Sequence, residues 1–273
     1  MKDFKGKVAV VTGAASGIGR ALAFEFARRG CALVLADIEA APLQAAEREI
    51  AGLGGAVVSR VADVSKRESV MALAEAAYEQ FPSVHILCNN AGVATWGGLE
   101  TARHEDWQWL MGVNLWGVIH GCEAFLPRMT AQAKQGRLGA GHVVNTASMA
   151  GLIASKGLGI YNTTKYAVVG LSETLQKDLR DYGIGVSVLC PMGVTTRIRE
   201  SERNRPAELR RPRDADTATE LIGQYIPAER AAALVMACIE ANQLYVVTHP
   251  ESEPALVRRF QRIREAYAFL KGK

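Results

Sequence analysis

The chain has 273 residues, of which 49% are hydrophobic and 22% charged, and its formal net charge is +4. These values are typical of soluble globular proteins with a large core. No apolar run approaches the roughly 18 residues that span a membrane, and the start, MKDFKGKVAVVTG, lacks the long apolar region of a signal peptide. We therefore expect a cytoplasmic protein with no membrane partner.

Short β-rich apolar runs alternate along the chain with amphipathic, alanine-rich helical stretches. This alternation predicts βαβ units and a parallel sheet of about seven strands, covered by helices on both faces, which is a doubly wound α/β fold. Ligands of such sheets bind beyond the carboxyl ends of the strands. In chain order the runs are KVAVVT, ALVLAD, AVVSRVAD, HILCNN, HVVNTAS, VSVLCP and LYVVTH.

The first strand is followed by VVTGAASGIGRAL, a glycine-rich turn that opens a helix. Its glycines allow a tight turn, the approach of a pyrophosphate to the backbone, and close packing of helix on sheet. The helix N-terminus supplies N–H groups for phosphates. The alternative is a plain strand–helix turn, but its place after the first strand favours a Rossmann-type dinucleotide site formed by Gly13, Ser16, Gly17, Ile18 and Gly19.

Asp37 ends the second strand, about 20 residues beyond the glycines. An acid at this place binds the ribose hydroxyls of a dinucleotide and repels a 2′-phosphate. No Lys or Arg stands at positions 14 to 16 or at Ile38 to hold such a phosphate. The pattern therefore predicts NAD rather than NADP, although Asp37 could instead be an exposed helix cap.

The later strands also end in small or polar residues, as expected for a cofactor channel. Each of these residues alone could be a cap or a turn former. A further asparagine, Asn114, lies in the helical stretch GVNLWG. The residues at the strand ends are Asp63, Val64, Asn90, Ala91, Gly92 and Ser148.

Tyr161 and Lys165 are spaced i, i+4 in GIYNTTKYAV, so a helix places them on one face. A free phenol has a pKa near 10. An ammonium group about 5 Å away, at an effective dielectric of ~20, stabilises the phenolate by about 3 kcal/mol. Alone, Tyr161 would more readily be a core tyrosine. Beside a nucleotide site, the pair predicts a tyrosine base with a lowered pKa.

Between residues 195 and 225 the alternation gives way to a polar, arginine-rich connection between a strand and a helix. Long connections in compact domains are often lids, and we expect a mobile substrate lid here. Acidic residues are interleaved and aromatic residues are absent from 196 to 213, which favours a solvated loop over a nucleic-acid surface. No linker divides the chain, so residues 1–273 are predicted to form a single domain.

Neither the five cysteines nor the five histidines show the spacing of a metal site, and no C-x-x-C pair indicates a disulfide framework. We expect the cysteines to be small core residues and the histidines to be structural. No bound metal is predicted.

Together these segments resemble the short-chain dehydrogenase/reductase family over nearly the whole chain. T-G-x-x-x-G-x-G appears at residues 12–19, N-N-A-G at 89–92 and Y-x-x-x-K at 161–165. The resemblance implies an adenine-side role for Asp63. One departure is Met192, in CPMGVTT, where the family usually has glycine. The family's other cofactor contacts match Pro191, Gly193, Val194 and Thr196.

The resemblance implies an NAD-dependent oxidoreductase that interconverts a secondary alcohol and its ketone. Tyr161 would transfer the proton, Ser148 would hold the substrate oxygen, Lys165 would bind the nicotinamide ribose, and Asn114 would position a water. The alternatives are an NADP-dependent carbonyl reductase or epimerase on the same fold, or a nucleotide-binding protein without catalysis. The resemblance also implies a homodimer or homotetramer, formed through helices near 107–129 and 161–182, and a C-terminal helical extension over about 251–273.

A group of apolar residues follows or flanks these motifs. If they line the cleft, they favour a bulky hydrophobic substrate, whereas the alternative is that they pack in the core or between subunits. They are Val93, Ala94, Trp96, Met149, Ile153, Leu158 and Met192.

Overall fold

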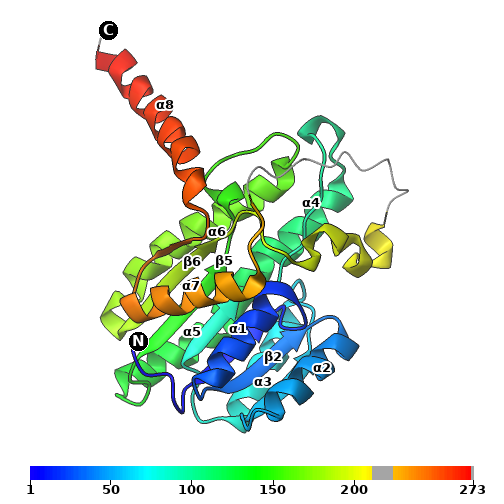
Figure 1. The fold of residues 1–273 in the computed structure, drawn as a ribbon, viewed down its shortest axis with the longest axis vertical. Helices are drawn as coiled ribbons and strands as arrows, with labels where there is room; N and C mark the ends of the chain where they lie inside the picture. Colours follow the sequence, from blue (N-terminus) through cyan, green and yellow to red (C-terminus); the bar gives the residue numbers. More distant parts are fainter. Residues whose placement is uncertain (211–223, 272–273) are drawn as a thin grey trace.

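All seven strands of the sheet run parallel to their neighbours, in the order β3-β2-β1-β4-β5-β6-β7. The computed structural model describes residues 1–210 and 224–271. The predicted doubly wound Rossmann-type sheet is confirmed (Figure 1). The strands are β1 (Val8–Thr12), β2 (Ala32–Asp37), β3 (Val57–Val61), β4 (Ile86–Asn89), β5 (Gly141–Thr146), β6 (Ile184–Cys190) and β7 (Tyr245–Val247).

Helices cover both faces of the sheet, because successive side chains of a buried strand point to opposite sides. Val11 of β1 belongs to the core beneath α1, α2 and α7, whereas Val10 belongs to the core beneath α3 and α5. On this second face α6 packs on β6. The helices are α1 (Gly17–Arg28), α2 (Ala40–Ala51), α3 (Arg67–Gln80), α4 (His104–Leu110), α5 (Gly117–Lys134), α6 (Gly159–Asp178), α7 (Ala228–Ala241) and α8 (Glu253–Lys271).

The strand order reverses between β1 and β4. From β1 the chain builds outward through β2 to β3, then returns to place β4 on the other side of β1 and continues to β7. The loops after β1 and β4 therefore leave the sheet in opposite directions. This divergence opens a crevice at the carboxyl ends of the two strands, which is where doubly wound folds bind ligands.

A single π-helical turn, η2 (Met111–Trp116), joins α4 to α5. Such wide turns are rare and occur mostly at functional sites. Asn114 lies within this turn and is fully buried.

Part of the predicted lid folds as two short 3₁₀ helices, η5 (Arg197–Asn204) and η6 (Ala207–Leu209). Polar contacts hold this part to the body. The buried Arg205 guanidinium donates to Asp106 of α4 at 2.5 Å, and the Ala94 amide donates to Ser201 Oγ at 3.1 Å. Residues 211–223 of the predicted lid lie outside the described residues.

The last helix, α8, occupies most of the predicted C-terminal extension and projects away from the sheet (Figure 1). None of its residues is buried. Across the described ranges, no helix combines the length and apolar character required to cross a membrane. In α8 several large apolar side chains are exposed, namely Val257, Phe260, Ile263, Tyr267, Phe269 and Leu270.

The Arg205–Asp106 pair gives a test of what anchors the lid segment. Asp106→Asn keeps the side-chain shape but removes the carboxylate charge opposite a buried guanidinium. Breaking a buried ion pair costs about 3–5 kcal/mol, so we expect urea denaturation to show a loss of about 3 kcal/mol in the free energy of unfolding.

Glu200→Gln is the matched control for this measurement. It breaks the pair between Arg197 and Glu200, whose side chains are 45% and 62% exposed. Exposed pairs contribute about 0–1 kcal/mol. Equal losses in the two variants would contradict a special role for the buried pair.

Candidate active site

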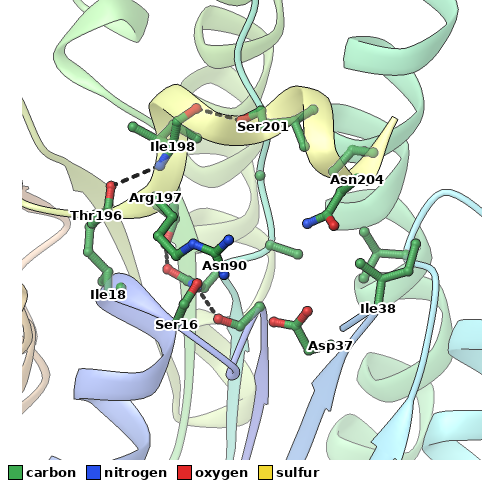
Figure 2. A pocket seen from close by; sticks show the side chains of 18 of the residues that line it. Ser16, Ile18, Asp37, Ile38, Asn90, Thr196, Arg197, Ile198, Ser201 and Asn204 are labelled. Atoms are coloured by element: carbon green, nitrogen blue, oxygen red, sulfur yellow. Dashed lines mark hydrogen bonds between the residues drawn. The ribbon is translucent and has the colours of Figure 1, made fainter. Parts of the chain in front are cut away.

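The crevice at the carboxyl ends of β1, β2, β4, β5 and β6 is a continuous pocket, roofed by η5 (Figure 2). Three of the predicted site residues, Gly19, Asn114 and Gly193, do not line it. The others do, namely Gly13, Ser16, Gly17, Ile18, Asp37, Ile38, Asp63, Val64, Asn90, Ala91, Gly92, Ser148, Tyr161, Lys165, Pro191, Val194 and Thr196.

The glycine turn leaves no room for side chains. Gly13 has φ +67°, and a Cβ there would lie 2.9 Å from the Ala91 Cα. A Cβ on Gly19 would lie 2.1 Å from the Gly13 carbonyl oxygen, closer than real Cβ atoms come. Gly19 is thus required behind the turn, where it lets α1 pack against the loop. The helix N-terminus can then present its free N–H groups to the pocket.

Hydrogen bonds of Asn90 fix the position of the loop after β4, which forms another wall of the pocket. Its amide nitrogen Nδ2 donates to the Thr12 carbonyl at 3.0 Å, and its Oδ1 accepts from Thr146 Oγ1 at 3.1 Å. The backbone N–H groups of Asn90 and Ala91 both donate to Thr12 Oγ1, at 2.9 and 3.1 Å. The ends of β1, β4 and β5 are therefore held together by side chains as well as by the sheet.

Asp37 stands at the end of β2 with its carboxylate at the pocket (Figure 2). Oδ2 accepts from the Ala15 amide and Oδ1 from the Glu39 amide, both at 2.9 Å. Burial raises the pKa of Asp37, and the backbone hydrogen bonds act in the opposite direction. A carboxylate oxygen has two lone pairs, so each oxygen can also accept a hydroxyl from a ribose.

Asp63, to which the resemblance assigns an adenine-side role, lines the pocket after β3. Its Oδ1 accepts from the Ser65 amide at 2.9 Å and from Ser65 Oγ at 2.7 Å. One carboxylate oxygen is therefore used to shape the turn after β3, and the side chains of Val64 and Ser65 continue the pocket wall.

At the other end of the pocket lie Ser148, Tyr161 and Lys165. Ser148 follows β5 and its Oγ accepts from the Ala150 amide at 3.1 Å. Lys165, only 3% exposed, donates from Nζ to the Thr146 carbonyl at 2.9 Å. Its Nζ lies 5.5 Å from the centre of the Tyr161 ring. The i, i+4 spacing in α6 therefore brings the two groups together as predicted.

The predicted direction of the tyrosine pKa shift was wrong for the protein without ligand. Burial raises the pKa of Tyr161 to about 12, and a side-chain hydrogen bond with Ser148 acts in the opposite direction. Burial also lowers the pKa of Lys165 to about 8. The low-dielectric surroundings disfavour both charged forms. The ionisation nearest to neutrality is therefore that of the lysine.

Asn114 lies behind the pocket wall and holds one loop in place. Its Oδ1 accepts from the Val93 amide at 2.8 Å, and its Nδ2 donates to the Val93 carbonyl at 2.9 Å. This paired contact ties the π-helical turn to the N-N-A-G loop. A Cβ on Gly92 would lie 3.4 Å from Asn114 Oδ1 and 3.5 Å from Lys165 Nζ. The water-positioning role stays a prediction.

The pocket contains charged residues that the sequence analysis did not assign to it: Glu39, Arg197 and Arg203. For the two arginines, the arginine-rich run at 196–213 was the only signal. Local patterns could not show that they pair with Glu39, about 160 positions earlier. Of the seven apolar residues considered for the cleft, Val93 and Met192 line it, and they are joined by Trp109 and Val113.

Within the described residues, no three His, Cys, Asp or Glu side chains are grouped so that they could hold a metal ion. All five cysteines are free thiols, and none of them lines the pocket.

Comparison with known proteins decides the family. The short chain dehydrogenase family matches residues 7–207. The chain belongs to this family. It is 35% identical to a "C alpha-dehydrogenase" of Sphingobium sp. over 98% of this chain and 88% of that protein, and 35% identical to a "CLA biosynthesis dehydrogenase/reductase" of Lactiplantibacillus plantarum over 96% and 95%.

A solved structure resembles this short-chain dehydrogenase over 97% of both chains. It is a short-chain dehydrogenase/reductase from Burkholderia phymatum in complex with NAD, with 40% identity and a TM-score of 0.88. The protein is accordingly an oxidoreductase of this family that uses a nicotinamide dinucleotide.

The glycine turn yields a test of the dinucleotide site. Gly19→Ala places a methyl group against the Gly13 carbonyl and must displace the turn, so we expect NAD affinity in titration calorimetry to fall at least about tenfold. Gly170→Ala, on an open face of α6 with nothing within 4 Å, should bind NAD normally, because alanine favours helix. Unchanged affinity in Gly19→Ala would contradict the close packing of the turn.

Proposed function

We propose that this short-chain dehydrogenase interconverts a hydrophobic secondary alcohol and its ketone, with NAD as cofactor and Tyr161 as the acid/base. One observation carries the proposal: Ser148, Tyr161 and Lys165 line the same pocket as the glycine turn and Asp37. A proton-transfer group and a dinucleotide cradle thus share one crevice.

The cradle fits a dinucleotide in shape and charge. A side chain at Gly13 or Gly19 would meet backbone, so the space in front of the turn suits a pyrophosphate. Bound there, the dinucleotide supplies the nicotinamide that accepts or gives the hydride. Asp37, with free lone pairs at the far end, would accept the ribose hydroxyls, and its negative charge supports NAD over NADP.

The protein's own groups handle the proton. In alcohol oxidation the Tyr161 phenolate takes the hydroxyl proton of the substrate, and in ketone reduction the phenol returns it. Ser148 Oγ, which accepts from the Ala150 amide and donates to the Pro191 carbonyl at 3.3 Å, would turn its proton from that carbonyl to the substrate oxygen. The Lys165 ammonium, 5.5 Å from the tyrosine ring, stabilises the phenolate when it forms.

The substrate end of the pocket supports a hydrophobic substrate. Trp109, Val113, Val93 and Met192 contribute apolar surface there. Met192 stands where the family usually has glycine, and its side chain would narrow this end or make it more apolar. The relatives named above are a dehydrogenase and a dehydrogenase/reductase, which is consistent with reversible alcohol–ketone chemistry.

We also propose assembly as a homodimer or homotetramer through α5 and α6. The indole of Trp116, at the start of α5, is 49% exposed and stacks on His120. A large aromatic side chain at this place is typical of interfaces. Light scattering that gave the mass of a monomer at micromolar concentration would contradict this assembly.

Tyr161→Phe tests the acid/base. It removes the hydroxyl but keeps the ring, so we expect turnover of NAD with a panel of secondary alcohols to fall about 10²–10⁴-fold, while NAD affinity stays within a few-fold. Tyr166→Phe, one residue beyond Lys165 on the same helix, is the matched control and should retain activity. Comparable activity in both variants would mean that another group carries the proton.

The buried tyrosine–lysine pair also predicts a pH profile. The lysine pKa of about 8 is the lower of the two, so the first proton lost leaves the pair mainly as phenol and neutral amine. The phenolate–ammonium tautomer holds the same number of protons, and we expect this tautomer to act as the base. We expect kcat/KM for alcohol oxidation to rise about tenfold per pH unit below 8 and to level off above it. Ketone reduction, which starts from the protonated phenol, should stay flat or fall over the same range.

Lys165→Met distinguishes this pair from a lone tyrosine. Without the lysine, the proton must leave a phenol whose pKa is raised to about 12. The rise of the oxidation rate should then continue through pH 8 without levelling. A profile that levels near pH 8 in the variant as well would assign the ionisation to another group.

A further inference from the structure

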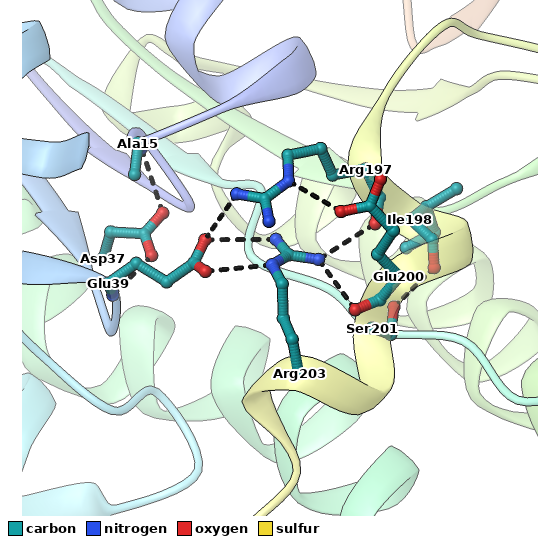
Figure 3. Close-up of polar contacts among 8 residues, drawn as sticks. All are labelled: Ala15, Asp37, Glu39, Arg197, Ile198, Glu200, Ser201 and Arg203. Carbon is teal, nitrogen blue, oxygen red and sulfur yellow. Dashed lines mark hydrogen bonds and ion pairs between the residues drawn. The ribbon is translucent and has the colours of Figure 1, made fainter. Parts of the chain in front are cut away.

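Glu39, two residues beyond Asp37, is bound by two arginines of the roof helix η5 (Figure 3). Arg203 holds it with two hydrogen bonds, from Nε to Oε1 at 2.9 Å and from Nη2 to Oε2 at 3.1 Å. Arg197 Nη1 approaches Oε2 to 3.7 Å. This geometry is the bidentate pairing in which a guanidinium binds a carboxylate most tightly.

The other terminal nitrogen of Arg203 is also occupied. Nη1 donates to the carbonyl oxygens of Arg197 and Glu200, both at 3.0 Å. The hydrogen bond from Arg203 lowers the pKa of Glu39, so this carboxylate is charged at neutral pH. The Glu39 and Arg203 side chains are only 18% and 23% exposed, which limits screening of the pair by water.

The cluster lies at the end of the pocket where NAD and NADP differ. The Glu39 amide donates to Asp37 Oδ1, and Glu39, Arg197 and Arg203 line the same wall as Asp37 and Ile38. In Figure 3 the two arginine side chains reach from η5 toward the carboxylates at the end of β2. Two guanidinium groups so placed would ordinarily bind a 2′-phosphate, because arginine matches phosphate geometry.

We propose that Glu39 is a cofactor-specificity residue: by occupying Arg203 and Arg197 it prevents them from binding the 2′-phosphate of NADP. This inference rests on the proposed NAD preference and extends it. Asp37 excludes the phosphate by direct repulsion, and Glu39 removes the cations that would offset that repulsion. The two carboxylates therefore act together, and neither alone sets the full preference.

The two roles predict a coupling that binding measurements detect. Asp37→Ala leaves the arginines paired with Glu39, and Glu39→Ala leaves the repulsion by Asp37, so each variant should gain little NADP affinity. In the double variant both obstacles are gone. We expect its NADP affinity, measured by titration calorimetry on purified protein, to exceed the product of the two single effects at least about tenfold.

Two further variants identify the cation. Adding Arg203→Ala to the double variant should abolish the gain, because the phosphate would lose its bidentate donor. Asp37→Ala combined with Glu200→Ala is the matched control, since Glu200 pairs with Arg197 Nε at 2.9 Å but does not touch Arg203 through its side chain or line the pocket. It should behave as Asp37→Ala alone.

Two results would overturn the proposal while leaving the NAD preference intact. In the first, the NADP affinity of the double variant equals the product of the two single effects. In the second, the gain in NADP affinity of the double variant persists after Arg203→Ala is added. In either case Glu39 only anchors η5. A wild type that binds neither dinucleotide, or binds both equally, contradicts the proposed cofactor preference itself and overturns this inference with it. Because binding is measured, the result does not depend on finding the alcohol substrate.

Discussion

The site depends on one steric constraint, the close approach of two backbone loops where the strand order reverses. The turn after β1 and the loop after β4 meet so tightly that a Cβ on Gly13 would lie 2.9 Å from the Ala91 Cα, and one on Gly19 would lie 2.5 Å from the side-chain nitrogen of Asn90. Thr12 and Asn90 then fix this contact with hydrogen bonds. Because the loops touch here and diverge beyond, the crevice has a rigid floor, and the free N–H groups of α1 point into it.

Two kinds of electrostatic environment share this crevice. At the catalytic end, burial without charge partners disfavours both phenolate and ammonium, which shifts the pKa of Tyr161 and of Lys165 in opposite directions. At the other end, backbone N–H groups donate to Asp37, although burial raises the pKa of this carboxyl, and guanidinium groups bind Glu39 and lower its pKa. The proposed proton transfer would use the first environment, and the proposed contact with the cofactor ribose would use the second.

The roof helix η5 connects these two ends to the rest of the molecule. Arg203 binds Glu39 at the end of β2, Ser201 accepts from the Ala94 amide after β4, and the following Arg205 is buried against Asp106 of α4. A segment without apolar periodicity is thus held in place largely by polar contacts, to which the packing of Leu209 near Trp109 adds apolar contact. The pair formed by Arg203 and Glu39 joins this helix to the wall of the pocket.

The sequence by itself determined the seven strands, the glycine turn, Asp37 at a strand end and the Tyr161–Lys165 face, because hydrophobic period and residue spacing are local properties. Because the carboxyl ends of parallel strands lie at one edge of the sheet, most of the residues that line the pocket could also be predicted. Only the tertiary structure decided the direction of the Tyr161 pKa shift, since burial depends on what packs around a residue. It alone also placed Arg203 against Glu39, a contact between residues 164 positions apart, because no local pattern encodes which charges a folded chain brings together.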